Sequence, residues 1–175
     1  MKKVLVTLLV TAIVLGMAIP VMADTPLTKQ LISDGRDTRE DVGDLTVTSD
    51  GTNLVVTFDT NASDWEMTET HLYVSTSTPI KSAPGKFPFK NEVLSDPNYD
   101  TYTIAYSDIP ASPGDMVSIA AHAELEKDVT VDSIIITLEE SAWAQESDYE
   151  NPLDTFIRLK KNWATYFEYT LAASP

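Results

Sequence analysis

The sequence predicts an all-β domain, an antiparallel β-sandwich of the jelly-roll or immunoglobulin-like kind with about seven to eight strands. Three observations support this fold class. Short runs alternate apolar and polar residues, as half-buried strands do. Turn-forming Gly, Pro, Asn and Asp separate those runs. No amphipathic helix of real length interrupts them; we expect at most one short helix, near 139–144.

The first 23 residues have the features of a signal peptide. Lys2 and Lys3 precede an apolar run over 4–19, and small residues lead up to Ala23. We therefore expect cleavage near Ala23; the alternative, a retained membrane anchor, lacks a stop-transfer flank. The remaining 24–175 would form a single domain that begins with a loose, polar and charged segment over 24–40. We expect a secreted or cell-surface protein.

Composition excludes several classes of function. The net charge of −15 argues against binding to nucleic acid, which needs a basic face. The absence of cysteine excludes thiol chemistry and Cys-ligated zinc. No second apolar run could span a membrane, so we expect no span in the mature chain. We expect a monomer, kept soluble by its acidity.

The first half of the domain predicts a hairpin followed by a central strand. Asp50-Gly51 lies between strands at 45–48 and 54–60 and indicates a tight turn. A strand then begins at Glu69, with Leu72 on one face and His71 on the other. A Pro-rich loop over 79–89 follows it.

The second half predicts four more strands. Residues 99–106 alternate well, and 116–125 form a strand of small residues. The run 129–138 is rich in β-branched residues and predicts one further strand, before the short helix. An aromatic strand over 162–171 closes the chain.

Five fragments occur together in one order. They are Val42-Gly43-Asp44-Leu45, Trp65 with Thr70–Val74 (THLYV), Pro84–Phe89 (PGKFPF), Ile119–Ala123 (IAAHA), and Glu140–Ala144 (ESAWA) followed by Asn162–Phe167 (NWATYF). In this pattern the chain resembles a family of exported bacterial and archaeal domains with relatives in eukaryotic microbes. The resemblance implies an exported β-sandwich module of unassigned activity, sometimes a building block of larger surface proteins. A strand-like insertion over 126–138 departs from the pattern.

The two histidines are candidates for a metal site. His71 and His122 each lie in the middle of a predicted strand, and Glu69 and Glu124 share their faces. If the strands are neighbours, the four side chains could form a shell for zinc or another divalent ion. The alternative is a pair of core histidines that hydrogen-bond within the fold.

Acidic residues near the start of the domain are a second candidate. Asp34, Asp37 and Asp41 lie close together in a turn-rich stretch and could supply several of the oxygens that calcium needs. Their spacing differs from that of an EF-hand. The alternative is a solvated loop that protects a sheet edge. No cofactor is required, and calcium and zinc are the two ions we consider.

Aromatic residues are a third candidate, as a stacking platform for a sugar. We consider Trp65, Phe87, Phe89 and Trp143 as ligand-binding residues, against the alternative that they pack in the core. No nucleophile elbow or metalloprotease motif appears, so we expect no enzyme. We therefore expect an extracellular binding module for a glycan, a cell-wall polymer or a protein. A secreted hydrolase and a purely structural surface domain are the alternatives.

Overall fold

The computed structural model describes residues 25–33, 39–79, 83–145 and 164–173, and the expected signal peptide lies outside them. Nine strands and two single-turn 3-10 helices make up the described elements. The strands are β1 Leu27–Ser33, β2 Asp41–Ser49, β3 Asn53–Asp59, β4 Glu66–Ser75, β5 Phe89–Asn91, β6 Tyr99–Ala105, β7 Met116–Val131, β8 Ile134–Gln145 and β9 Phe167–Thr170. The 3-10 helices are η1 Pro84–Lys86 and η2 Tyr106–Asp108. No helix in this part of the chain is long and apolar enough to cross a membrane.

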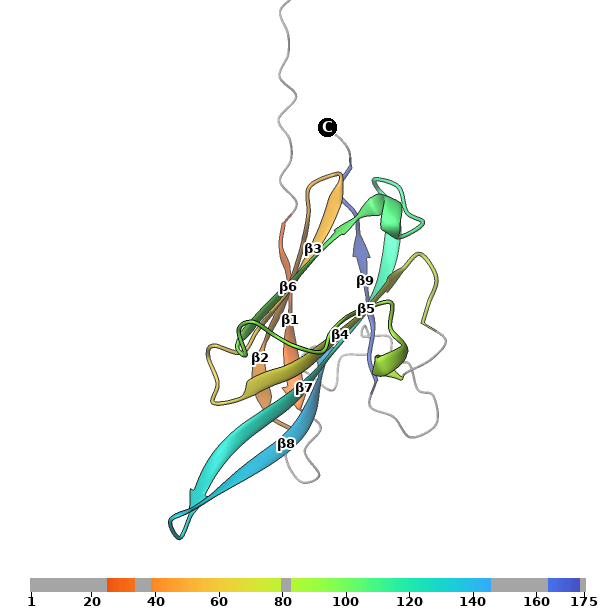
Figure 1. Cartoon of the computed structure of the whole chain (residues 1–175). Coiled ribbons are helices and arrows are strands. Elements are labelled where there is room, and N and C mark those ends of the chain that lie inside the picture. Colours follow the sequence, from red (N-terminus) through yellow and green to blue (C-terminus); the bar gives the residue numbers. More distant parts are fainter. Residues whose placement is uncertain (1–24, 34–38, 80–82, 146–163, 174–175) are drawn as a thin grey trace, which may run out of the picture.

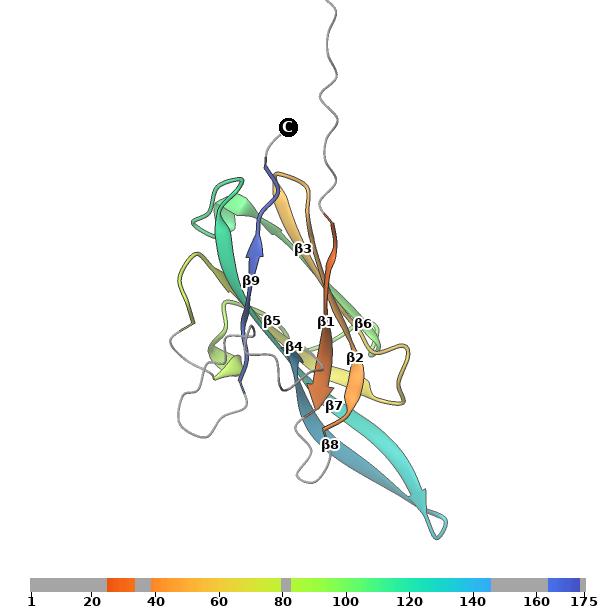
Figure 2. The ribbon, with the colours of Figure 1, turned by 180° about the vertical axis from the view of Figure 1, so that it is seen from behind.

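The fold is all-β and antiparallel, as predicted. Its strands follow the order β5-β4-β7-β8-β1-β2-β3-β6, and β9 pairs with β7 beside β8. Hydrogen bonds link all of them into one sheet, which curls into a half-barrel (Figures 1 and 2). The predicted separation into two stacked sheets is therefore not visible in the strand pairing, because β1 joins the two halves.

The core lies inside this curl. Alternate residues of β2 and β3 are fully buried, among them Leu45, Val47 and Phe58. They belong to the same hydrophobic cluster as Leu72 of β4 and Ile119 of β7. Inward-facing positions from both halves of the sheet thus share one core, as the period-2 pattern requires.

Side chains close the open side of the curl, where β6 approaches β4. The Tyr102 hydroxyl donates a hydrogen bond to the Thr70 carbonyl at 3.0 Å and lies 2.7 Å from the Thr70 hydroxyl. Burial is the main cause that raises the pKa of Tyr102 to about 12. Thr60 donates its backbone N–H to the Asn98 carbonyl at the same end.

Two elements differ from the sequence prediction. Within the segment expected to be loose, Leu27–Ser33 forms β1 in the middle of the sheet, between β2 and β8. Its buried Lys29 hides the strand signal; the ammonium lies 5.6 Å from the centre of the Phe167 ring. The predicted helix near 139–144 is instead part of β8, because pairing with β7 and β1 outweighs the helix preference of Glu and Ala.

The single strand predicted over 129–138 is also wrong, because a turn divides this run between two strands. Asp132 and Ser133 both have positive φ, at 50° and 68°, which is the backbone of a two-residue type I′ turn. β7 and β8 therefore form one long hairpin. We call its outer part, Lys127–Leu138, the ribbon; it projects beyond the rest of the domain (Figures 1 and 2).

Candidate functional site

The strand register brings the predicted histidine cluster together. β4 and β7 are antiparallel neighbours, with His71 directly opposite His122 and Glu69 directly opposite Glu124. Both imidazoles are buried, and the His122 ring contacts Trp143 edge-on at 4.8 Å between centroids. They lie on the outer face of the sheet, where a second hydrophobic cluster, the outer cluster, covers them. Its members are Phe87, Ala120, Trp143, Ala164 and Tyr166, with Tyr73 packed against them.

The two imidazoles face each other through one pair of nitrogens. The Nδ1 atoms of His71 and His122 are 3.4 Å apart. The Nε2 atoms point to the carboxylates on their own strands, at 3.4 Å from Glu69 and 3.7 Å from Glu124. Burial, followed by the neighbouring His71, lowers the pKa of His122 to about 3. Burial also lowers the pKa of His71, against the opposing effect of Glu69. In this environment both imidazoles are therefore neutral.

This arrangement is not the predicted metal shell. The carboxylates lie at Nε2, on the far side of each ring from the facing Nδ1 atoms. Among the described residues no group of three or more potential ligands could hold a metal ion. In the acidic stretch, Asp41 begins β2 and accepts hydrogen bonds from the Gln30 amide and the Gly43 N–H. Asp34 and Asp37 lie outside the described residues.

Three of the candidate aromatic residues, Trp65, Phe87 and Trp143, are buried. Their burial counts against a sugar platform built from these three rings. Trp65 donates its indole N–H to the Glu40 carboxylate at 3.2 Å, and Phe87 packs edge-on against Trp143. Phe89 is partly buried against the main core.

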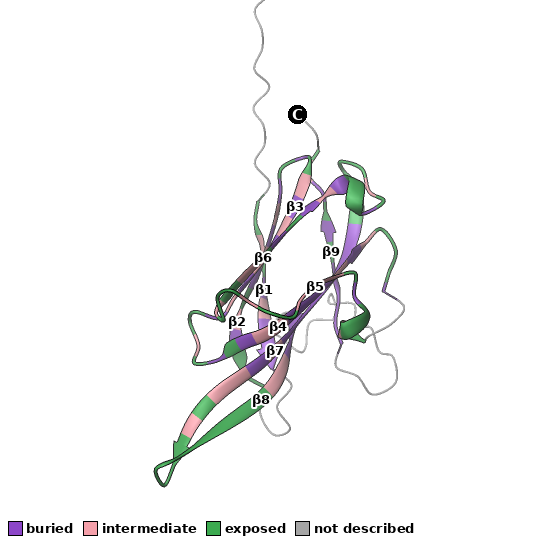
Figure 3. Ribbon diagram, in the orientation of Figure 1, coloured by how far each residue is buried: buried purple, intermediate pink, exposed green. Residues whose placement is uncertain are grey.

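The ribbon carries the exposed apolar surface that the sequence prediction missed. On the side that continues the core face, Val129 lies opposite Ile136 and Val131 opposite Ile134. On the other side, Ile135 is 68% exposed. The other large apolar side chains exposed on the ribbon are Val131, Ile134, Ile136 and Leu138. Figure 3 shows this part of the hairpin as exposed along most of its length. The sequence signal that could have indicated this surface is the presence of branched aliphatic residues on both faces of the run 129–138.

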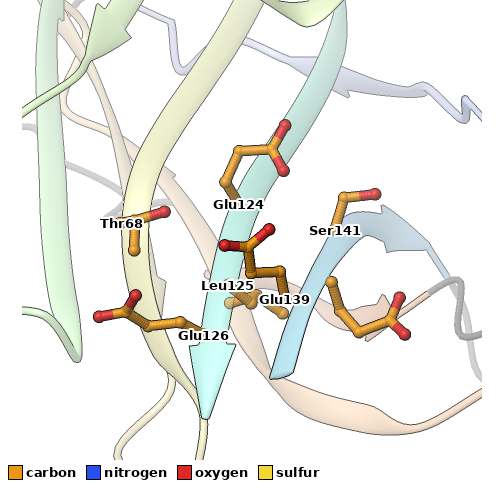
Figure 4. A pocket seen from close by; sticks show the side chains of 7 residues that line it. Thr68, Glu124, Leu125, Glu126, Glu139 and Ser141 are labelled. Carbon is orange, nitrogen blue, oxygen red and sulfur yellow. The ribbon is translucent and has the colours of Figure 1, made fainter. Parts of the chain in front are cut away.

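Carboxylates surround the base of the ribbon. A recess of about 420 Å³ lies there between β4, β7 and β8 (Figure 4). It is lined by Thr68, Glu124, Leu125, Glu126, Glu139, Glu140 and Ser141. Glu126 lies directly opposite Glu139 on β8 and directly opposite Glu66 on β4. Burial, then Glu69 and Glu139, raise the pKa of Glu124. Like charges placed opposite each other across strands destabilise a sheet.

The described residues therefore offer two distinct features. The first is a buried, neutral histidine pair that is packed under the outer cluster. The second is an exposed aliphatic ribbon with an acidic base. Comparisons of the chain with models of protein families, with curated proteins and with solved structures found no match.

Proposed function

We propose that the protein is an exported interaction module whose contact element for another protein is the ribbon. The observation that carries this proposal is the exposure of branched aliphatic side chains beyond the core, with Ile134 at 64% and Ile135 at 68%. Apolar surface gains roughly 25 cal/mol per Å² when it leaves water, so this surface favours a partner. Contiguous exposed apolar patches mark interaction sites in soluble proteins.

The chemistry of the ribbon favours a protein over a glycan. Sugars stack on aromatic rings, and Lys127–Leu138 contains none. Trp65 and Trp143 are buried elsewhere. The alternative of a hydrolase gains little support from His71 and His122, because both are buried and face each other.

Export is part of the proposal. The charged and apolar leader before Ala23 supports it. A two-layer description of the fold belongs here too. Its support is that the core draws Leu45 and Phe58 from one half of the sheet and Leu72 and Ile119 from the other.

Site-specific photo-crosslinking in the producing cells tests the contact. A photoreactive residue in place of Ile135 should give a discrete adduct with a partner protein. The same residue in place of Thr103, exposed on β6, is the matched control and should give none. Adding Ile134→Asp and Ile136→Asp should abolish the Ile135 adduct. Equal adducts from both positions, or an adduct that survives these substitutions, would contradict the proposal.

A separate measurement tests export. The protein recovered from the medium or the cell surface should begin at Asp24 by N-terminal sequencing. A chain that stays in the cell and begins at Met1 would refute export without affecting the contact role of the ribbon.

A further inference from the structure

We infer that the partner of the ribbon supplies an extended strand, in which aliphatic and basic residues alternate, and that this strand pairs with the open edge of β8 over Ile134–Glu140. This inference rests on the proposed function, because it names the chemistry of the partner. The mode is β-strand addition, in which main-chain hydrogen bonds give affinity and alternate side chains give specificity.

The first observation is the open edge itself. β8 pairs with β7 along Ile134–Trp143, but β1 covers its other edge only from Ala142 to Gln145. In the described part of the chain no strand lies beside Ile134–Ser141 on that side. β1 ends at Ser33, whose N–H donates a hydrogen bond to the Glu40 carbonyl just before β2 begins. An added strand would continue the line of β1 beyond Ser33.

The edge of β8 is the better acceptor of the two ribbon edges. β4 pairs with β7 up to Glu126, so within the described residues the edge of β7 without a paired strand is Lys127–Val131. That edge is shorter than Ile134–Ser141. Exposed sheet edges present unpaired N–H and C=O groups and act as templates for another strand.

The second observation is that the two faces of β8 differ. Ile134, Ile136 and Leu138 share the face that continues the core. The opposite face carries Thr137 and Glu139, with Ile135 near the tip. Side chains of adjacent strands contact neighbours on the same face. An added strand therefore needs aliphatic residues at every second position and polar or charged residues between them.

The third observation decides the sign of that charge. On the outer face, Glu139 lies opposite Glu126, and Glu126 in turn lies opposite Glu66. Asp128 is on the same face and accepts a hydrogen bond from Thr137 at 2.7 Å. A lysine or arginine placed next to Glu139 would offset these like-charge contacts, whereas an acid would add to them.

A second copy of this chain fits the edge less well. Antiparallel pairing of two β8 edges about Thr137 would place Ile135 beside the Glu139 of the other copy. It would leave the carboxylates without a cation and join two chains of net charge −15. The two apolar faces would also lie side by side, so the exposed apolar area would double and none of it would be buried.

A lipid bilayer fits less well too. The acidic base next to the apolar tip opposes anionic headgroups. The ribbon also lacks the Trp and Tyr that favour the membrane interface.

Titration calorimetry with defined peptides tests the inference on the full mature chain. The probe is Lys-Val-Lys-Val-Lys-Val-Lys, with Glu-Val-Glu-Val-Glu-Val-Glu and the block peptide Lys-Lys-Lys-Lys-Val-Val-Val as controls. We expect the alternating basic peptide to bind, and its affinity to fall with added salt. Both control peptides should bind at least about tenfold more weakly, because each lacks either the charge or the alternation.

Two substitutions locate the contact. Glu139→Lys should weaken binding of the basic peptide about threefold to tenfold, because attraction becomes repulsion. Glu168→Lys, a matched charge reversal at an exposed position of β9, should leave the affinity unchanged. Hydrogen exchange should slow at backbone amides within Ile134–Glu140 when the basic peptide is added, and not along β9.

Several results would overturn the inference. They are equal affinity for the alternating and block peptides, no binding of the alternating basic peptide, or protection away from β8. Sedimentation as a dimer that Ile136→Ser dissociates would identify a second copy as the occupant. Co-sedimentation with phosphatidylcholine vesicles that the same substitution abolishes would identify lipid. If the Ile135 crosslink to a protein persists while the peptides fail, only the strand chemistry is refuted; loss of both refutes the proposed function as well.

Discussion

His71 and His122 lie directly opposite each other on β4 and β7, with their Nδ1 atoms 3.4 Å apart. Two neutral rings satisfy this geometry when one donates its Nδ1–H and the other accepts. The pair is buried under Trp143 of the outer cluster, so water does not compete for the contact. These histidines therefore connect two strands on the face opposite the core.

The histidine pair predicts a loss of stability in acid. The pKa of His122 is lowered from 6.5 to about 3, so the unfolded chain binds this proton first as the pH falls. The contribution of His122 to the free energy of unfolding should be fully present above about pH 6.5. It should be lost as the pH falls toward 3, on the order of 2–4 kcal/mol in all.

His122→Gln tests that origin. The substituted protein should be less stable at pH 7, and its urea midpoint should fall less between pH 7 and pH 4 than that of the unchanged protein. The facing His71 and the neighbouring Glu69, Glu124, Glu139, Lys90 and Glu92 remain in both proteins, so the difference reports His122 together with its interaction with His71. Parallel pH profiles of the two proteins would show that His122 does not titrate in this range.

Tyr102→Phe should loosen the closure between β6 and β4. The substitution removes the hydroxyl that bonds to the Thr70 carbonyl and hydroxyl, and leaves those groups without that partner in a buried place. We expect a loss of about 1–2 kcal/mol in the free energy of unfolding, measured by urea denaturation. Tyr99→Phe removes a hydroxyl from an exposed position on the same strand and should change little. Equal effects would argue against the closing role of Tyr102.

Gly43→Ala should destabilise the fold strongly. Gly43 has φ of 154°, and an added Cβ would lie 2.2 Å from the Asp59 carbonyl oxygen on β3. The backbone of β2 or β3 would have to move, and we expect a loss of about 2–4 kcal/mol. Gly85→Ala is the matched control, because its Cβ would meet nothing within 4 Å. Similar thermal midpoints for the two variants would contradict this account.

Ser133→Gly should stabilise the ribbon. Ser133 has a φ of 68°, which glycine adopts without the strain of a side chain, and Asp-Gly is a preferred pair for this turn. The expected gain is about 0.5–1 kcal/mol, visible as slower hydrogen exchange across Val131 and Ile134. Thr130→Gly, at an exposed strand position one residue before the end of β7, should have the opposite effect. A loss of protection in Ser133→Gly would refute the turn assignment.

Local chemistry was enough to predict part of this structure. The Asp50-Gly51 turn is confirmed: Gly51 has φ of 87°, and the Asp50 carboxylate accepts hydrogen bonds from the Thr52 and Asn53 N–H groups. The alternation around His71 correctly placed Leu72 and the histidine on opposite faces of the strand, and the structure shows that the face of Leu72 is the core face.

Other parts depended on distant contacts that no local pattern reports. β1 is polar in sequence and becomes a strand because β2 and β8 lie on either side of it. The turn at Asp132-Ser133 uses positive φ without glycine, so the run around it looked like one strand. The aromatic side chains of Trp65 and Trp143 gave no sign of which would be exposed. Trp65 is buried in the core inside the curl, whereas Trp143 is buried on the outer face by the outer cluster.

The pairing of β1 with β8 has a consequence for when the chain can fold. Leu31 lies opposite Ala144, and Ser49 reaches the Tyr169 hydroxyl at 3.1 Å, so the first strands find their neighbours near the end of the sequence. Such distant pairings slow folding, because a long loop must close first. A growing chain cannot complete this sheet until β8 has left the ribosome. Until then its first strands lack their neighbours, and such an unfinished sheet suits the export that we propose.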